Sequence, residues 1–473
     1  MNKDVKISCC IVDRFEYHKD VPFRPSEHYP EYPFGVFSKT KNPVYETVRE
    51  AFHLMGYDSQ NYGTGKWNPL GEVIKKNDFV LIKPNLVLQH NGTGEGEECL
   101  YTQPSVVAAV IDYCLIALGG TGRIVIGDAP IQSCDFDRLV AESGYIGLID
   151  FYRNHGIEIE LLDFRSVISN TKATKKLKND DRDGIEVDLG CLSKFYDVES
   201  KNTKYRITSY NPKYVMQNHH GSIQKYLIHK YVLNADVIIN MPKPKCHRKA
   251  GITASLKNFV GINCRKEYLP HHVFGAISEG GDEYCKKNYF KKQSSKYLDY
   301  ANKYYDEKRS LLGFFCRSLS DMYNIFSKLR DDGFSEGSWY GNHTISKTIA
   351  DLNTIVKYSD KTGSMQSNPQ RRIIVVADMI ICGEKEGPLL PSPKAVGAIV
   401  VSNDLLSFDE FVCLVMGFNP LLIPTFVDST EEKKDWEVVS NSPKFNKKNR
   451  VDLANEPIFR FEPSSGWKGH IEL

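Results

Sequence analysis

The middle of the chain alternates short apolar runs with one long stretch of helical periodicity. The short runs predict five strands, at residues 79–82, 123–126, 235–240, 372–377 and 397–402. Between the first two, residues 104–118 have apolar positions at helical spacing, and Gly119 and Gly120 end that pattern. Strand, helix and strand in this order predict a βαβ unit. We therefore expect an α/β fold with a mainly parallel sheet, or sheets, flanked by helices.

Other segments depart from this pattern and suggest a division of the chain. Residues 163–218 are charged and rich in Asn, which predicts a small β-rich insertion, whereas residues 266–365 predict a helical insertion. The expected parts are an N-terminal extension over the core (1–75), a first α/β part with the β-rich insertion (76–265), the helical insertion (266–365), and a second α/β part with the C-terminal tail (366–473).

The helical insertion carries an amphipathic stripe. Apolar residues recur at spacings of three and four at Leu311, Phe315, Leu319, Met322, Phe326 and Leu329. Such a stripe is typical of a helix packed on the protein body. With the lysines at 286, 287, 291 and 292 close by, residues 282–330 also fit a helix that binds a membrane surface or a protein partner.

Composition and charge narrow the classes of protein. Hydrophobic residues make up 41% and charged residues 25%, as in globular proteins, and the formal net charge is only +2. We expect no nucleic-acid partner and a cytoplasmic location, either free or peripheral to a membrane. The 12 cysteines lack CxxC spacing, so no iron–sulfur cluster is expected, and the absence of the glycine-rich nucleotide motifs predicts no NAD site and no ATP site.

Polar residues stand where four of the predicted strands end. They are Lys83 and Asn85, Asp128, His247 with Lys257, and Asp378. Each alone also fits a turn or a helix cap. Because the carboxyl ends of parallel strands form one edge of a sheet, where α/β proteins bind ligands, the set predicts a site for a small anion.

The segment from 233 to 262 holds the densest of these groups. A basic loop with Lys243, Lys245 and His247 precedes small residues, including Gly251, Thr253 and Ser255. Small residues let a ligand approach the backbone, and a helix that begins there would offer its amides to an anion. A solvated basic loop before an ordinary helix is the alternative. On the site interpretation, His247, Lys257 and Asp128 are catalytic, and the substrate is bound by Lys83, Asn85, Lys245, Gly251, Thr253 and Ser255.

A divalent metal is a further option. The adjacent histidines His271 and His272, together with Asp378, are candidate ligands, since imidazole and carboxylate both bind transition metals. A structural role for the two histidines fits the sequence equally well.

Six stretches resemble the uncharacterised family named domain of unknown function 362. They are LIKPNL (81–86), GDAP (127–130), ADVIINMPKPKCH (235–247), GITASLKNFVGI (251–262), DMIICGEKEGP (378–388) and SNDLLSFDE (402–410). The closing GWKGHIE resembles the tail of members found beside surface-polysaccharide genes. Many relatives also carry ferredoxin-like cysteine motifs, which this chain lacks.

Residues 235–257 are also similar, more distantly, to the nickel-pincer lactate racemase family. That resemblance implies an acid/base role for His247 and a nicotinate-derived cofactor held by Lys257, ten positions later, with the histidines near 271 at the place of the nickel ligand. The second acid/base histidine of those racemases has no counterpart, and Asp128 stands roughly at that strand end.

These observations favour an enzyme of acid/base chemistry on a hydroxy acid, a sugar acid or a phosphorylated sugar, within surface-polysaccharide biosynthesis. An ordinary pKa of about 6.5 would suit His247 to proton transfer near neutral pH. The alternative is a non-catalytic assembly or scaffold protein of a polysaccharide machinery that docks through residues 282–330. An iron–sulfur redox protein is a third, disfavoured option.

Overall fold

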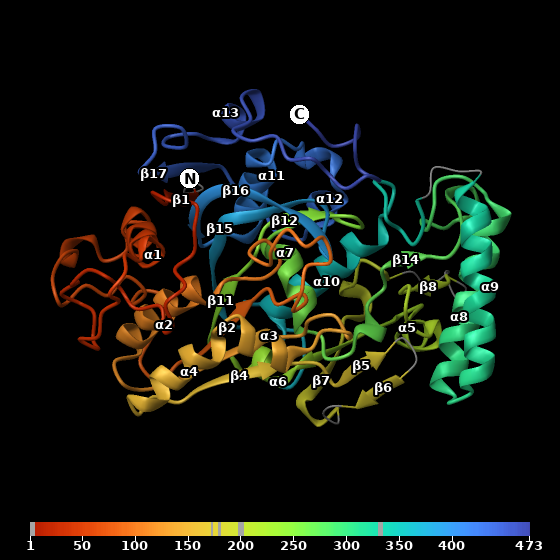
Figure 1. Cartoon of the computed structure of the whole chain (residues 1–473), viewed down its shortest axis with the longest axis horizontal. Coiled ribbons are helices and arrows are strands. Elements are labelled where there is room, and N and C mark those ends of the chain that lie inside the picture. Colours follow the sequence, from red (N-terminus) through yellow and green to blue (C-terminus); the bar gives the residue numbers. More distant parts are fainter. Residues whose placement is uncertain (1–4, 172–173, 178–180, 197–202, 330–333) are drawn as a thin grey trace.

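A single large sheet forms the centre of the protein (Figure 1). This computed structural model describes residues 5–171, 174–177, 181–196, 203–329 and 334–473. The strand order is β17-β1-β16-β15-β11-β2-β3-β4. The strands are β1 (Val5–Ile11), β2 (Phe79–Pro84), β3 (Arg123–Asp128), β4 (Ile159–Asp163), β11 (Val237–Met241), β15 (Arg372–Glu386), β16 (Leu390–Ser402) and β17 (Trp436–Ser440).

The pairing from β15 through β11, β2 and β3 to β4 is parallel, and β16 is antiparallel to both β15 and β1. The expected α/β fold with a mainly parallel sheet is therefore confirmed. No helix among the described residues is both long enough and apolar enough to cross a membrane.

Two hydrophobic cores lie on opposite faces of the sheet, because successive strand residues point to opposite sides. In β2, Val80 and Ile82 enter one core and Leu81 enters the other. The first core is covered by α1 (Pro43–Leu54), α2 (Pro104–Leu118), α3 (Phe136–Glu142) and α4 (Tyr145–Asn154). The second is covered by α7 (Ser255–Asn258), α10 (Thr344–Tyr358) and α11 (Leu405–Val415).

The helix expected over residues 104–118 is confirmed at both ends. Pro104 occupies its first turn, where a proline has no hydrogen bond to lose, and Gly119 caps it in the left-handed conformation with φ of 59°. The strands expected at 79–82 and 123–126 each continue for two more residues. Those extra residues include Lys83 and Asp128, so both side chains are fixed by the sheet rather than carried by a loop.

Two expected strands are much longer than the sequence predicts. The runs at 372–377 and 397–402 are parts of β15 and β16, which pair with each other as far as Glu386 and Leu390. The expectation that a strand ends at Asp378 is wrong. Antiparallel pairing with β16 satisfies the β15 backbone beyond the point where the parallel partner β11 ends, so the strand continues through a polar stretch.

The strands β12 (Lys245–His247) and β13 (Gly251–Thr253) also belong to this sheet, because β12 pairs with β15 as well as with β13; the remaining elements lie around it. The other short strands are β5 (Val167–Thr171), β6 (Thr174–Leu177), β7 (Gly184–Asp188), β8 (Tyr205–Arg206), β9 (His219–His220), β10 (Ile223–His229) and β14 (His272–Val273). The other helices are α5 (Pro212–Asn218), α6 (Lys230–Asn234), α8 (Tyr289–Asp306), α9 (Ser310–Lys328), α12 (Pro424–Asp428) and α13 (Arg450–Asn455). Parts of the expected segments 1–75, 163–218 and 266–365 lie outside the described residues.

The N-terminal residues contribute to the sheet itself. β1 lies between β16 and β17, and its Val5 and Ile7 belong to one of the two cores. A segment expected to cover the core thus also supplies one of the strands of that sheet.

Candidate functional site

A buried ion pair marks the carboxyl edge of the sheet. Lys83, near the end of β2, and Asp128, at the end of β3, are 0% and 2% exposed. The Lys83 ammonium nitrogen lies 2.6 Å from Asp128 Oδ1, while Oδ2 of the same carboxylate accepts a hydrogen bond of 2.6 Å from the Leu86 amide. Two of the predicted strand-end residues are therefore in direct contact, as the sheet-edge argument requires.

The loop after α7 closes over this pair. A Cβ atom at Gly261 would lie 2.0 Å from Asp128 Oδ1 and 2.8 Å from the Lys83 nitrogen, so only glycine fits there. Asn258 donates a 3.1 Å hydrogen bond to the Lys83 carbonyl and one of 2.7 Å to Asn240 Oδ1. The GITASLKNFVGI stretch thus packs directly onto the ends of β2 and β3.

His247 is held as a neutral ring. The expected basic loop is in fact a hairpin of β12 and β13, in which Cys246 points into the apolar core and its neighbours point to the other side. His247 Nδ1 accepts hydrogen bonds from the amides of Lys249 (3.1 Å) and Ala250 (3.0 Å), so the ring proton is on Nε2. Burial, and then the charge of Lys257, lower the pKa of His247 well below its ordinary value. The ordinary pKa assumed from the sequence is therefore wrong.

Lys257 lies in α7 beside His247 and is half-buried. Burial, followed by the charges of Lys266 and Lys249, lowers its pKa to about 7. Within the described part of the chain its ammonium group has no hydrogen bond or ion pair. A side chain that is surrounded by protein, retains some solvent contact and has no partner is available to a ligand.

Three further lysines share this environment. Burial lowers the pKa of Lys245 to about 7, and those of Lys249 and Lys266 to about 8. Their nitrogens donate only to neutral oxygens: Lys245 to Asn85 Oδ1 (2.8 Å) and Leu100 O (2.6 Å), Lys249 to Thr208 Oγ1 (3.0 Å), and Lys266 to Val260 O (3.0 Å). We call Lys245, Lys249, Lys257 and Lys266 the strand-end lysines.

The strand-end lysines are an excess of buried positive charge. Among the described residues, none of the four forms an ion pair with a carboxylate. Burying an unpaired ammonium is unfavourable, and each of these lysines responds with a lowered pKa. Groups perturbed in this way, by burial and by like charges, cluster at functional sites. A bound anion would supply the missing negative charge.

The expected anion site at the start of α7 is already filled by the chain itself. Asp409 of α11 accepts hydrogen bonds from the amides of Ser255 (2.7 Å) and Leu256 (3.1 Å), and from the Ser255 hydroxyl (2.6 Å). Ser255 and the amides of this helix therefore bind an internal carboxylate in this structure.

Two other residues of the small-residue turn behave differently from Ser255. Gly251 has φ of +76°, and a Cβ there would crowd Ile423 and Trp467 at 3.2 Å, so its role is conformational. Thr253 Oγ1 is buried and has no hydrogen-bond partner in the described structure. A buried hydroxyl without a partner is unusual, and it leaves a polar group for a ligand next to Lys245, its partner in the β12–β13 ladder.

Asp378 belongs to a second ion pair. Its carboxylate lies 3.0 Å from the Lys243 nitrogen and accepts hydrogen bonds from the Tyr17 hydroxyl (2.6 Å) and the Gln103 amide (3.0 Å). These partners are buried or nearly so, and together they fix the end of β11 to the N-terminal segment. Asp378 is thus engaged by a lysine rather than placed beside His271 and His272.

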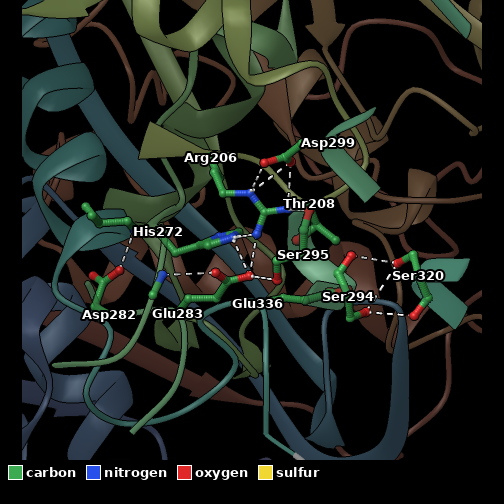
Figure 2. A network of polar contacts seen from close by, with 12 residues as sticks. Arg206, Thr208, His272, Asp282, Glu283, Ser294, Ser295, Asp299, Ser320 and Glu336 are labelled. Atoms are coloured by element: carbon green, nitrogen blue, oxygen red, sulfur yellow. Dashed lines mark hydrogen bonds and ion pairs between the residues drawn. The ribbon is translucent and has the colours of Figure 1, made fainter. Parts of the chain in front are cut away.

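His271 immediately precedes β14, which begins at His272, and the two rings have different partners. His271 Nδ1 donates to the Leu269 carbonyl (2.7 Å), and burial with the charge of Lys249 lowers its pKa to about 3. Figure 2 shows His272 beside Arg206 and Glu283. Its Nε2 lies 3.5 Å from Arg206 Nη1 and 3.8 Å from Glu283 Oε1. Among the residues that the structure describes, no three or more His, Cys, Asp or Glu side chains are grouped so that they could hold a metal ion. The metal site remains a prediction.

Several residues of the site could not be identified from the sequence. Tyr17 and Asp409 lie far along the chain from the residues they meet, and Lys266 follows the predicted motif without being part of it. Lys249 was visible only as one cation in a basic run. The one available signal was the SNDLLSFDE stretch, where Asp404 caps α11 and Asp409 faces inward toward Ser255.

The C-terminal tail packs on the β12–β13 turn next to the site. Trp467 is fully buried, and its indole nitrogen donates a 2.8 Å hydrogen bond to the Arg248 carbonyl in the β12–β13 turn. A separate surface cavity of about 440 Å³ lies between α3, α4 and β4. Its lining includes Asp137, Asp150 and Glu160, which would oppose an anion.

Comparison with known proteins agrees with the sequence motifs. Residues 80–179 and 193–414 match the family model described as Domain of unknown function (DUF362). The chain is also 28% identical over 193 residues to the thylakoid-associated protein sll1697 of Synechocystis sp.; the match covers 41% of this chain and 41% of that protein. Since the family model covers more than half of the sequence, the chain belongs to the DUF362 family.

Proposed function

We propose that the protein is an enzyme that binds a small anionic substrate among the strand-end lysines and transfers a proton there. The observation that carries this proposal is the group of four lysines whose pKa values are lowered and which form no ion pair with a carboxylate of the described chain. A hydroxy acid, a sugar acid or a phosphorylated sugar has the charge and the size to fit this chemistry. Surface-polysaccharide biosynthesis supplies substrates of this kind.

Lys257 is the best candidate for the base in this proposal. A general base acts best when its pKa is near the working pH, and a pKa of about 7 leaves much of Lys257 as the neutral amine before a ligand binds. His247 has the opposite property: its ring stays neutral and its Nε2–H can donate a hydrogen bond to a substrate oxygen. Lys257 would then remove a proton while His247 stabilises the charge that develops on the substrate.

The ion pair of Lys83 and Asp128 has a positioning role in this proposal. Asp128 stands roughly where lactate racemases have their second acid/base histidine, but its carboxylate is held by Lys83 and by the Leu86 amide. From that resemblance we therefore carry over only the pairing of His247 with Lys257. Racemase or epimerase chemistry assisted by a metal at His271 is a finer version of the same proposal.

Sulfate tests the binding step, because it remains a dianion over the whole pH range of interest. Its affinity should be highest near pH 6 and should fall by about tenfold or more by pH 9, since the strand-end lysines lose their protons as pH rises through about 7 to 8. Binding near pH 8 should also take up protons, because the anion raises the lysine pKa values. Titration calorimetry in buffers of different ionisation enthalpy measures both quantities.

Lys257→Met should remove most of this binding, whereas Lys66→Met, at an exposed lysine far along the chain, should leave it unchanged. Sulfate affinity that does not depend on pH, or that is the same in both variants, would contradict the proposed site.

The alternative function, a scaffold protein of a polysaccharide machinery, makes a different prediction for the same residues. If it is correct, His247 and Lys257 are dispensable and function depends on α8 and α9. Complementation of a deletion strain with His247→Gln and with a chain that lacks α8 and α9 separates the two functions, because the enzyme needs His247 and the scaffold needs the two helices.

A further inference from the structure

The helix α9 exposes its apolar face. Leu311 is 88% exposed, Phe315 60%, Ile325 62% and Leu329 76%, and Phe314, Met322 and Phe326 are exposed as well. These residues recur at spacings of three and four, so they form one stripe along the helix. We call them the α9 stripe. Helices of globular proteins usually turn such a stripe toward the core.

The opposite face of α9 consists of small residues that pack against α8. Its buried positions are Gly313, Cys316, Ser320 and Ser327. A Cβ at Gly313 would lie 2.5 Å from the Tyr305 ring, and the Ser320 hydroxyl donates a 2.9 Å hydrogen bond to the Ser294 carbonyl. The expectation that the amphipathic helix packs its large apolar residues on the body is therefore wrong. Small residues make the contact with α8, and most of the large residues remain outside.

The hairpin of α8 and α9 is firmly attached to the rest of the protein. It lies at the edge of the molecule farthest from the N-terminal elements (Figure 1). Figure 2 shows Arg206 of β8 bound to Asp299 of α8 at 2.7 Å and to Glu283, which precedes α8. Arg206 Nη2 also donates to the Ser295 carbonyl at 3.1 Å. This buried network fixes the direction in which the stripe faces.

The hairpin, with the short segment that leads into it, is also basic. Residues 284–329 contain ten Lys and Arg against four Asp and Glu, a net charge of +6, whereas the whole chain has only +2. The rest of the protein is therefore acidic on balance. Exposed lysines of the hairpin include Lys296, Lys308 and Lys328.

We propose that the α9 stripe docks on the surface of an anionic phospholipid bilayer. The apolar side chains would enter the boundary between headgroups and acyl chains, and the surrounding lysines would bind lipid phosphates. Helices of this type lie in the plane of the interface, as the exposed length of α9 allows. This surface is independent of the strand-end lysines and of the reaction proposed for them.

The charge favours a bilayer over a second copy of the chain. Two copies that met through their α9 stripes would bring two segments of net charge +6 together, which is unfavourable. An anionic bilayer has the complementary charge, and its attraction decreases with added salt.

Co-sedimentation of the full chain with vesicles tests the proposal. Vesicles of phosphatidylcholine with about a third phosphatidylglycerol should bind the protein at least about tenfold better than pure phosphatidylcholine. The triple variant Leu311→Asn, Phe315→Asn, Ile325→Asn should bind the anionic vesicles with an affinity lower by about tenfold or more. The same decrease is expected for the triple variant Lys296→Glu, Lys308→Glu, Lys328→Glu.

Matched variants elsewhere on the surface provide the controls. One control is the triple variant Leu421→Asn, Val427→Asn, Val451→Asn, which removes comparably exposed apolar side chains. The other is the triple variant Lys66→Glu, Lys213→Glu, Lys361→Glu, which reverses the charge of three exposed lysines. Both should bind vesicles as the unchanged protein does. Circular dichroism confirms that each variant is folded. Equal binding to neutral and anionic vesicles overturns the proposal. A dimer in light scattering that the α9 substitutions disperse also overturns it, and identifies a second copy as the partner.

Discussion

Lys257→Met should make the protein more stable while removing its affinity for anions. At about pH 6 the ammonium of Lys257 is charged in both the folded and the unfolded chain, but only the folded chain holds it partly buried beside other lysines. Methionine keeps most of the side-chain volume and removes that charge, so we expect the free energy of unfolding to rise by about 2 kcal/mol. Urea denaturation measures this change, and calorimetry measures the loss of sulfate binding.

The increase in the free energy of unfolding of Lys257→Met should become smaller as pH rises. The Lys257 pKa is about 7 in the folded chain against a reference value of 10.5, so between these values the unfolded chain binds more protons. The stability of the unchanged protein therefore rises with pH over this window, and the advantage of methionine shrinks. Lys291→Met is the control, since that buried lysine donates to the Phe334 carbonyl at 2.5 Å and its loss should destabilise. A destabilised Lys257→Met would show that Lys257 has a structural role.

Asp128→Ala should have the largest effect on stability. It leaves the Lys83 ammonium buried without its carboxylate, and it deprives the Leu86 amide of its acceptor. Removing one partner of a buried ion pair costs about 3–5 kcal/mol. We expect a loss of that size in the free energy of unfolding, measured by urea denaturation at neutral pH.

The double variant Lys83→Met, Asp128→Leu should recover much of this loss, because it removes both charges and keeps the site filled. The pair should therefore show a large coupling energy in a double-mutant cycle. Independent, additive effects of the two substitutions would contradict the buried ion pair.

The local pattern of the sequence was sufficient to predict the framework of the site. The periodicity of residues 104–118 and Gly119 predict α2, and the apolar runs before Lys83 and Asp128 predict β2 and β3. Because parallel strands end at a common edge, the meeting of Lys83 with Asp128 follows from the strands alone.

Contacts between distant segments could not be predicted in this way. Asp409 occupies the amides at the start of α7 from 154 residues away, which no local pattern reveals. The direction of the α9 stripe was equally hidden, since periodicity shows that one face of a helix is apolar and not which way it turns. The length of β15 beyond Asp378 was hidden as well, because it depends on pairing with β16 and not on an apolar pattern within β15.

Diffraction from crystals soaked in selenate tests the central claim most directly, because selenium scatters anomalously and selenate has the shape and charge of sulfate. We predict an anomalous peak within hydrogen-bond distance of the Lys257 nitrogen, with further contacts to other strand-end lysines or to Thr253. The peak should be absent in Lys257→Met crystals soaked in the same way. Selenate bound only at exposed lysines, with no peak beside Lys257 at a saturating concentration, would contradict an anion site at this edge of the sheet.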